Sequence, residues 1–480
     1  MKFPRSIPLL GPMFALPLFC QLLHAQPDFL IHAAPVTVAA PDPAIASALK
    51  TIQPAHIEET IKTLVGFGTR NTLSSMDTDL PPGQGINGAA DWIAAQFAQI
   101  AHDCGGCLEV HRDTFTEPAG DRITQPTTIT NIYAILPGSD PIQAKRMVLV
   151  TGHYDSRNTN VLDAHGAAPG ANDDASGVAV SLECARALSK LHLPATVVFV
   201  AVAGEEQGLN GSNHLAKLAR SEGWQLEAVL NNDIVGGNTT PGDNLQLKDR
   251  VRVFSEGLPL AATPEQARRI RALGEENDSP SRQLARAVAD TARAYFPAAS
   301  GAPYSAFLVS RPDRYLRGGD HISFNREGYA AVRFTEWRED FNHQHQNIVL
   351  PQPGSSDPIL GDLIQFVDFN YVANVARLNA ATLATLALSP GEPVKVAIQA
   401  RKLDNNSTLQ WEAPAGATAN THYELLWRET TAPDWQFFQT VPAQAEGGPI
   451  TATVPISKDN VIFGVRSVDA AGHRSLVVVP

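Results

Sequence analysis

Residues 197–209 read Val-Val-Phe-Val-Ala-Val-Ala-Gly-Glu-Glu-Gln-Gly-Leu, an apolar run that ends in a glycine and two adjacent acids. Such a short, valine-rich run is typical of a strand that is buried on both faces of a sheet. Polar residues that follow parallel strands meet at one edge of the sheet, where ligands bind. Two acids at a helix start are often only solvated, so the function of Glu205 and Glu206 depends on the segments around them.

Strand-like and helix-like segments alternate on both sides of this run, which predicts an α/β sandwich with a mostly parallel buried sheet. The segments expected as strands are 129–136, 147–151, 197–203 and 229–230, and those expected as helices are 57–65, 88–100, 175–188, 281–296 and 363–388. The polar stretch 238–303 is expected to leave the sheet and to wall or cover a site.

The chain changes character after Ser389-Pro390-Gly391-Glu392-Pro393, where two prolines and a glycine favour a linker. Seven short apolar or alternating runs follow, which is typical of a small β-sandwich. The pattern around Trp411, 423–427 and 463–469 resembles a fibronectin type III module. We therefore expect a catalytic domain over 26–389 and a fibronectin type III-like domain over 390–480 that is dispensable for chemistry.

Length and charge narrow the class of protein. A chain of 480 residues exceeds what one hydrophobic core usually serves, which agrees with two folded units. The 37 basic and 49 acidic side chains give a net charge of −12, so nothing favours binding to a phosphate backbone. We expect no nucleic acid partner, and the sequence does not determine the oligomeric state.

Residues 1–25 have the order of a secretory signal peptide. Lys2 and Arg5 precede an apolar stretch over 7–23, and the small residue Ala25 follows. Prolines and a glycine break this stretch, which is too short for a comfortable membrane span. We expect cleavage after Ala25 and a secreted or periplasmic protein with no integral membrane segment.

Three cysteines remain after removal of the signal peptide. Cys104 and Cys107 form a local pair that is expected to close a disulfide in an oxidising compartment, with a redox site as the weaker alternative. Cys184 lies in an apolar helical pattern and is expected to be a buried thiol.

Four segments that follow a predicted strand or enter a helix concentrate His, Asp and Glu. A metal-bound imidazole commonly donates its other N–H to a carboxylate, so His153 is a candidate ligand with Asp155 behind it. Asp173 lies in Asn172-Asp173-Asp174, and two adjacent acids exceed what helix capping requires. Asp173 is therefore the candidate that joins two metal ions, one through each oxygen. Asp233 ends another predicted strand.

The two glutamates acquire separate roles beside such a cluster. One carboxylate can ligate a metal ion while its unligated neighbour takes a proton from water. The order of all these motifs resembles the two-zinc aminopeptidases of peptidase family M28, whose relatives include glutamate carboxypeptidases and glutaminyl cyclases. The resemblance covers roughly residues 50–385 and rests on five ordered pieces: His-x-Asp, Asn-Asp-Asp-Ala-Ser-Gly, Gly-Glu-Glu, an Asp at a strand end, and Asp-His followed by a late His.

The resemblance implies the zinc-peptidase α/β sandwich and a secreted zinc-dependent aminopeptidase that acts on the N-termini of peptides or proteins. By residue-for-residue transfer, His153 and Asp233 hold one Zn²⁺. Glu206 and a late histidine hold a second Zn²⁺, and Asp173 bridges the two ions. A hydroxide shared by the two ions would attack the peptide carbonyl, with Glu205 as the general base.

The late histidine is His343 or His345. Family members commonly place a polar or acidic residue four positions after this ligand, and Asn347 follows His343 at that spacing whereas Val349 follows His345. We therefore favour His343 and keep His345 as the alternative. In an extended segment the two histidines share a face, so a small change of register could exchange them.

Two further features concern neighbours of the ligands. The pair Asp320-His321 matches a family segment that does not bind metal, so we place Asp320 with Asp155 behind the ligands and His321 in the site wall or structure. Asn342 stands directly before His343, where some relatives carry a tyrosine that holds the oxyanion. Zinc itself could supply much of that stabilisation.

Other reactions on this fold stay open as alternatives. A carboxypeptidase requires cationic groups for a C-terminal carboxylate, and Arg314, Arg317 and Arg333 are candidates. A single-zinc glutaminyl cyclase would not need the full bridging set of ligands. A noncatalytic binding protein would not need Glu205 together with a complete set of ligands.

Overall fold

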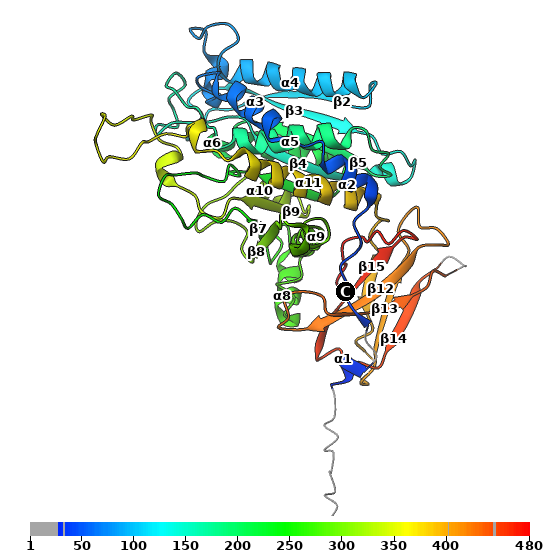
Figure 1. Cartoon of the computed structure of the whole chain (residues 1–480). Helices are drawn as coiled ribbons and strands as arrows, with labels where there is room; N and C mark the ends of the chain where they lie inside the picture. Colours follow the sequence, from blue (N-terminus) through cyan, green and yellow to red (C-terminus); the bar gives the residue numbers. More distant parts are fainter. Residues whose placement is uncertain (1–26, 32–33, 402, 445–447) are drawn as a thin grey trace, which may run out of the picture.

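The computed structural model describes residues 27–31, 34–401, 403–444 and 448–480, and a mixed eight-stranded sheet forms its centre (Figure 1). The expected signal peptide, 1–25, lies outside the described residues. In their order across the sheet the strands are β2 (Glu109–Glu117), β3 (Thr127–Leu136), β5 (Thr196–Val202), β4 (Arg146–His153), β6 (Gln225–Asn232), β9 (Ala331–Thr335), β7 (Arg250–Ser255) and β8 (Ser305–Val309).

Parallel pairing is confined to part of this sheet. The neighbours β5, β4, β6 and β9 are parallel to one another, and β7 is parallel to β8. Antiparallel pairs join β2 to β3, β3 to β5, and β9 to β7. The expectation of a mostly parallel sheet therefore holds for the centre, whereas the whole sheet is mixed.

Helices cover both faces of the sheet, as expected for an α/β sandwich. Val148 and Val150 of β4 face one hydrophobic cluster, whereas Leu149 faces another, because successive side chains of a strand point to opposite faces. The first cluster packs against α2 (Pro43–Leu49), α3 (Pro54–Val65), α4 (Gly85–Asp103), α5 (Ala175–Leu188), α9 (Pro280–Tyr295) and α11 (Phe369–Leu388), and the second packs against α7 (Asn210–Ser221) and α10 (His321–Arg326).

The last helix before the C-terminal strands begins later than expected from its apolar pattern. Residues Ile364–Phe366 form a 3₁₀ turn, and α11 starts only at Phe369. The side chain of Asp368 accepts hydrogen bonds from the backbone N–H groups of Asn370 and Tyr371. An aspartate cap of this kind sets a helix start that hydrophobic periodicity cannot locate.

The polar stretch 238–303 was expected to leave the sheet and cover a site, but it does not form such a separate cover. It contains β7, α8 (Pro264–Leu273) and α9, so the stretch adds a strand to the sheet and a helix to the core. The buried residues Leu284 and Val288 of α9 recur at helical spacing and pack against the sheet. This part of the chain is therefore structural along most of its length.

The C-terminal residues form two antiparallel sheets. One contains β10 (Val394–Ile398), β11 (Ser407–Glu412) and β14 (Ile450–Val454); the other contains β13 (Phe437–Val441), β12 (His422–Glu429) and β15 (Val461–Val468). Trp411 and Trp427, from different sheets, are buried in one cluster. The last of the seven runs expected as strands, residues 476–479, makes only the isolated bridge of Val478 to Val465.

The N-terminal segment joins this C-terminal module, which the expected division at residue 389 did not include. After the short helix α1 (Asp28–Ile31), strand β1 (Ala34–Pro35) pairs with β13. The indole N–H of Trp427 also donates to the carbonyl of Phe29 at 3.0 Å. The module thus contains a strand from the other end of the chain.

The C-terminal module lies beside α9 (Figure 1). Buried charges join the two parts. Asp278 lies just before α9, and its side chain is fully buried. It forms ion pairs with Arg286 at 3.1 Å and with Arg428 of β12 at 2.6 Å. The indole N–H of Trp435 donates to Gln283 at 3.0 Å. A module with such contacts is packed against the rest of the protein and is not tethered by the linker alone. The linker is therefore not sufficient reason to expect that the module is dispensable.

We expect Asp278→Ala to lower the free energy of unfolding by about 3–5 kcal/mol, because it leaves two buried arginines without their anion. Urea denaturation measures this change. The matched control is Asp434→Ala, which removes the half-exposed pair with Arg293 across the same interface and is expected to cost at most about 1 kcal/mol. Equal effects of the two variants would contradict a buried electrostatic anchor.

The expectations for the cysteines and for a membrane-spanning segment can be compared directly with the structure. Cys104 and Cys107 are joined by a disulfide at the end of α4, and Cys184 is a buried free thiol. Among the described residues, every helix falls short of the length or the hydropathy needed to cross a membrane.

Candidate metal centre and active site

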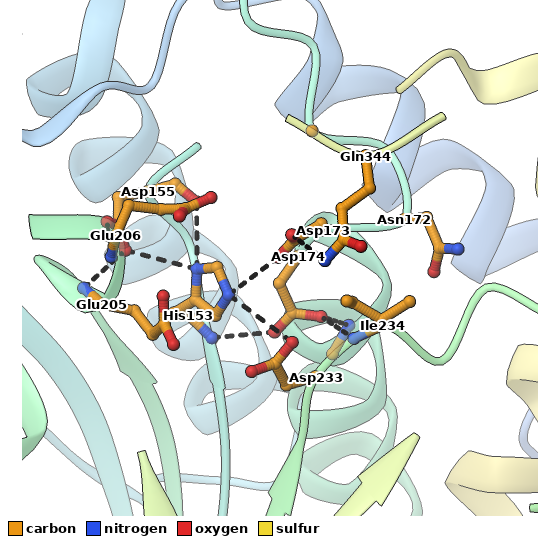
Figure 2. A network of polar contacts seen from close by, with 12 residues as sticks. His153, Asp155, Asn172, Asp173, Asp174, Glu205, Glu206, Asp233, Ile234 and Gln344 are labelled. Carbon is orange, nitrogen blue, oxygen red and sulfur yellow. Dashed lines mark hydrogen bonds and ion pairs between the residues drawn. The ribbon is translucent and has the colours of Figure 1, made fainter. Parts of the chain in front are cut away.

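The acidic and histidine side chains converge where the parallel strands end, as Figure 2 shows. His153 is the last residue of β4, and Asp233 directly follows β6. After β5, Gly204 adopts a left-handed conformation (φ 78°) that turns the chain into α6 (Glu205–Gly208). Asp173 lies in the loop before α5. The sheet thus brings together four segments that are far apart in the sequence.

A first group of candidate ligands contains His153, Asp173 and Asp233, all buried. The Nε2 atom of His153 lies 3.1 Å from Oδ1 of Asp173 and 3.9 Å from Oδ1 of Asp233. One nitrogen and two carboxylates at this spacing form a set of ligands suited to a divalent cation.

A second group contains Asp173, Glu206 and His345. The Nε2 atom of His345 lies 2.8 Å from Oδ2 of Asp173 and 3.0 Å from Oε1 of Glu206. Asp173 therefore directs Oδ1 to the first group and Oδ2 to the second. This is the geometry of a carboxylate that can join two neighbouring cations.

The structure places His345, and not the favoured His343, beside Asp173 and Glu206. The ring of His343 stacks on Phe366 with centroids 3.5 Å apart, and its Nδ1 lies 3.1 Å from the hydroxyl of Thr240. Residues Phe341–His343 form a 3₁₀ turn and His345 has φ 55°, so the segment is not extended. The two histidines therefore do not share a face, and the geometry favours His345, the alternative, over the choice made from Asn347.

Asp155 lies behind the first group and beside the start of α6. Its Oδ1 lies 3.4 Å from Nδ1 of His153, and its two oxygens accept the backbone N–H groups of Glu205 and Glu206 at 3.3 and 3.2 Å. Asp155 thus orients the histidine and holds the start of α6 with one carboxylate. Asp320 is also buried near His153, and this burial raises the pKa of Asp320 to about 7.

Two acids that the motif analysis did not single out position the bridging residue and its loop. Asp362 accepts the backbone N–H groups of Asn172 at 2.8 Å and Asp173 at 2.7 Å. Asp174 accepts the N–H groups of His153 at 2.9 Å and of Gly177 at 3.0 Å. Asp174 was visible as the second acid of its motif, whereas no local pattern marks Asp362.

Two arginines contact the candidate ligands. Neither of them was identified from the sequence as a partner of a ligand. Arg333 lies 2.7 Å from Oδ1 of Asp233 and is fully buried. Arg157 lies 3.3 Å from Oε2 of Glu206, the oxygen that faces away from His345. Each arginine can fix the orientation of one carboxylate.

The donor atoms fit zinc. Nε2 of His153 and Oε1 of Glu206 are buried and have no hydrogen-bond partner among the described residues, although both point into a ligand group. Burial opposes a positive charge on His345, but Glu206 and Asp173 outweigh it and raise the pKa of His345 to about 10. The pocket therefore attracts cations, and imidazole nitrogen with carboxylate oxygen is a common ligand set for Zn²⁺.

Glu205 lies beside the groups without belonging to either. Burial raises the pKa of Glu205 well above its usual value, against the opposing charge of His153, and the carboxylates of Asp233 and Glu206 add to the rise. A carboxylate with increased proton affinity beside a cation site can accept and return a proton.

Comparison with known proteins identifies the family. Residues 131–350 match the model of peptidase family M28. A probable zinc metalloprotease of Pyricularia oryzae is 44% identical over 92% of this chain and 85% of the relative, and one of Leptosphaeria maculans is 41% identical over 92% of this chain and 97% of the relative. The crystal structure of the Legionella pneumophila LapA aminopeptidase aligns with a TM-score of 0.48 at 19% identity, over 79% of this chain and 80% of that chain. By its relatedness to the curated proteins, the chain belongs to peptidase family M28 and is a zinc metalloprotease.

Proposed function

We propose that the protein is an aminopeptidase that binds two zinc ions and releases residues from the N-termini of peptides. The observation that carries the proposal is the position of the Asp173 carboxylate, whose two oxygens face two different ligand groups. His153, Asp173 and Asp233 would hold one ion; Asp173, Glu206 and His345 would hold the other. When bound, zinc supplies Lewis acidity that polarises the scissile carbonyl and lowers the pKa of water.

Glu205 serves as the general base in this proposal. A carboxylate oxygen of Glu205 takes a proton from the attacking water and later delivers it to the leaving amine. Asp155 holds the backbone of Glu205 and thereby orients the base relative to His153. Because Glu205 is outside both ligand groups, its carboxylate is free for this transfer.

The charges around the site favour a free amine over a free carboxylate on the substrate. Arg314 and Arg333, which the sequence offered for a C-terminal carboxylate, are buried and paired with Glu339 and Asp233. Arg317 is a third exposed and also lies near Glu339. With these cations engaged, the acids of the site are better suited to a substrate ammonium group than to a carboxylate.

The alternatives lose support for specific reasons. A single-zinc glutaminyl cyclase does not require the second group, yet His345 lies 2.8 Å from Asp173 and 3.0 Å from Glu206. A noncatalytic binding protein does not require Glu205 as an unligated acid beside two groups. Export to an oxidising compartment is part of the proposal and is supported by the disulfide between Cys104 and Cys107.

A substrate panel tests the proposal. Zinc-loaded protein is assayed against aminoacyl reporters, the same peptides with an acetylated N-terminus, and the same peptides with an amidated C-terminus. We expect acetylation to abolish cleavage and amidation to leave it unchanged. The reverse pattern would identify a carboxypeptidase, and formation of pyroglutamate without hydrolysis would identify a cyclase.

Paired histidine variants test the second ligand group. We expect His345→Ala to lose one of two zinc ions and most of the activity, because its Nε2 faces two carboxylates. His343→Ala should keep both ions, since that ring stacks on Phe366 outside the groups. Metal content is measured by atomic emission after dialysis. Loss of zinc from the His343 variant alone would return the ligand role to His343.

A further inference from the structure

A tight turn beside the site carries two apolar side chains into solvent. The backbone N–H of Arg317 donates to the carbonyl of Arg314 at 3.2 Å and closes a turn with Tyr315 and Leu316 at its corners. Tyr315 is 77% exposed and Leu316 is 93% exposed. Leu316 has φ 58°, a conformation that favours glycine or asparagine at this position of a turn.

The fold does not explain a leucine at this corner. An exposed side chain buries no apolar surface, and the left-handed backbone costs a leucine conformational free energy that glycine would not pay. The best residue for the turn alone is therefore glycine. A strained, exposed apolar residue that the fold does not use points to a contact outside the chain.

One end of the turn is tied to the first ligand group by buried charges. The guanidinium of Arg314 lies 3.1 Å from Asp313, and Asp313 lies 3.3 Å from Arg333. Arg333 contacts Asp233 at 2.7 Å. Asp313 and Arg333 are both buried, so this chain of ion pairs is shielded from solvent.

The other end of the turn is tied to the bridging carboxylate. Arg317 donates to Oε1 of Gln344 at 3.3 Å, and Nε2 of the same amide donates to Oδ2 of Asp173 at 3.2 Å. The side chain of Arg317 and one amide group therefore separate the end of the turn from Asp173, and Gln344 is labelled beside Asp173 in Figure 2. The turn is thus joined at both ends to the ligand groups, and it forms a rim of the site.

A third exposed apolar side chain lies at this rim. The guanidinium of Arg317 stacks over the ring of Phe341 at 5.7 Å from the centroid, and Phe341 is 63% exposed. The neighbouring side chains of Arg314 and Arg317 already pair with an acid, because both lie near Glu339. Arg311 stacks over the ring of Tyr315 at 5.6 Å from the centroid, so the rim offers apolar surface beside this cation.

We propose that Leu316, together with Tyr315 and Phe341, binds an apolar side chain in the part of a peptide substrate that follows the released residue. The inference rests on the proposed aminopeptidase function for the direction of the peptide. An extended peptide advances about 3.3–3.6 Å per residue, so a rim separated from Asp173 by one amide and an arginine side chain corresponds to a residue beyond the scissile bond. Leu316 is thus a specificity-determining residue.

The test compares wild type with Leu316→Gly on alanine tetrapeptide amides that carry leucine at the second, third or fourth position. We expect wild type to show, for at least one leucine peptide, a kcat/KM about tenfold above that of the all-alanine peptide, mainly through KM. Leu316→Gly should lose this preference, keep its rate on the all-alanine peptide, keep its zinc, and melt at the same or a higher temperature. The matched control, Leu403→Gly, replaces an equally exposed leucine of the C-terminal module and should keep the preference.

Each other outcome overturns the proposal. A wild type without any leucine preference, or a Leu316→Gly variant that retains it, shows that the turn does not read the substrate. A lower melting temperature shows that the leucine serves the fold. If wild type cleaves only N-acetylated peptides, the proposed aminopeptidase function fails, and the same leucine scan on those peptides still tests the turn separately.

Discussion

Replacing Glu205 by glutamine is expected to slow peptide hydrolysis by about 10²–10⁴-fold, the usual contribution of a general base. Glutamine keeps the shape of the side chain but cannot take the proton. The hydrogen bond from the Glu205 backbone N–H to Asp155 stays, so the start of α6 should not move. The zinc content should therefore equal that of the wild type. Single-turnover rates with metal analysis on the same sample measure both quantities.

The neighbouring acid provides the matched control. Glu206→Gln makes the same chemical change one residue later, at the carboxylate whose Oε1 lies 3.0 Å from His345. We expect this variant to lose zinc from the second ligand group together with activity. Undiminished turnover in the Glu205 variant would assign the base to another residue, and loss of zinc from it would make Glu205 a ligand.

Asp173→Ala is expected to remove both zinc ions and the activity together, because its two oxygens face both ligand groups. Loss of a residue that only supports a ligand typically lowers metal affinity 10–100-fold. Loss of a shared ligand should therefore exceed about 100-fold for each ion. Competition with a fluorescent chelator measures the two affinities.

An acid outside the centre serves as the control for this variant. Asp357 is exposed, and Asp357→Ala should leave zinc affinity and activity unchanged. Asp173→Asn adds a second comparison, since an amide keeps the size of the side chain but lacks the charge and one of the two acceptor oxygens. If one ion stays bound to Asp173→Ala at wild-type affinity, Asp173 does not bridge.

The sequence by itself predicted four of the eight strands of the sheet and most of the acids that meet at its edge. The run 197–203 is apolar because β5 is buried on both faces, and this signal lies in consecutive residues. His153, Glu205 and Asp233 stand at or directly after strand ends, so the convergence of parallel strands predicted that they meet. The limits of α5 were also predicted correctly from apolar spacing.

The family resemblance placed the sequence in a zinc peptidase family, but it favoured His343, whereas the structure places His345 beside Asp173 and Glu206. His343 and His345 are two residues apart. Which of the two faces the ligand groups depends on the 3₁₀ turn over Phe341–His343 and on the left-handed backbone of His345. The contacts that stabilise this path, such as the stacking of His343 on Phe366, come from another part of the chain. No local spacing rule can report them.

Only the tertiary structure decided which charges support the centre and how the two ends of the chain are held. Asp362 hydrogen-bonds the backbone of Asp173 across 189 positions of the sequence, and Arg428 reaches Asp278 across 150. Strand β1 likewise finds its partner in the C-terminal module. Hydrophobic periodicity and strand-end acids are local properties that a sequence displays directly. The pairing of buried charges depends on which distant segments the packed core brings within a few ångströms, and that is settled only when the chain folds.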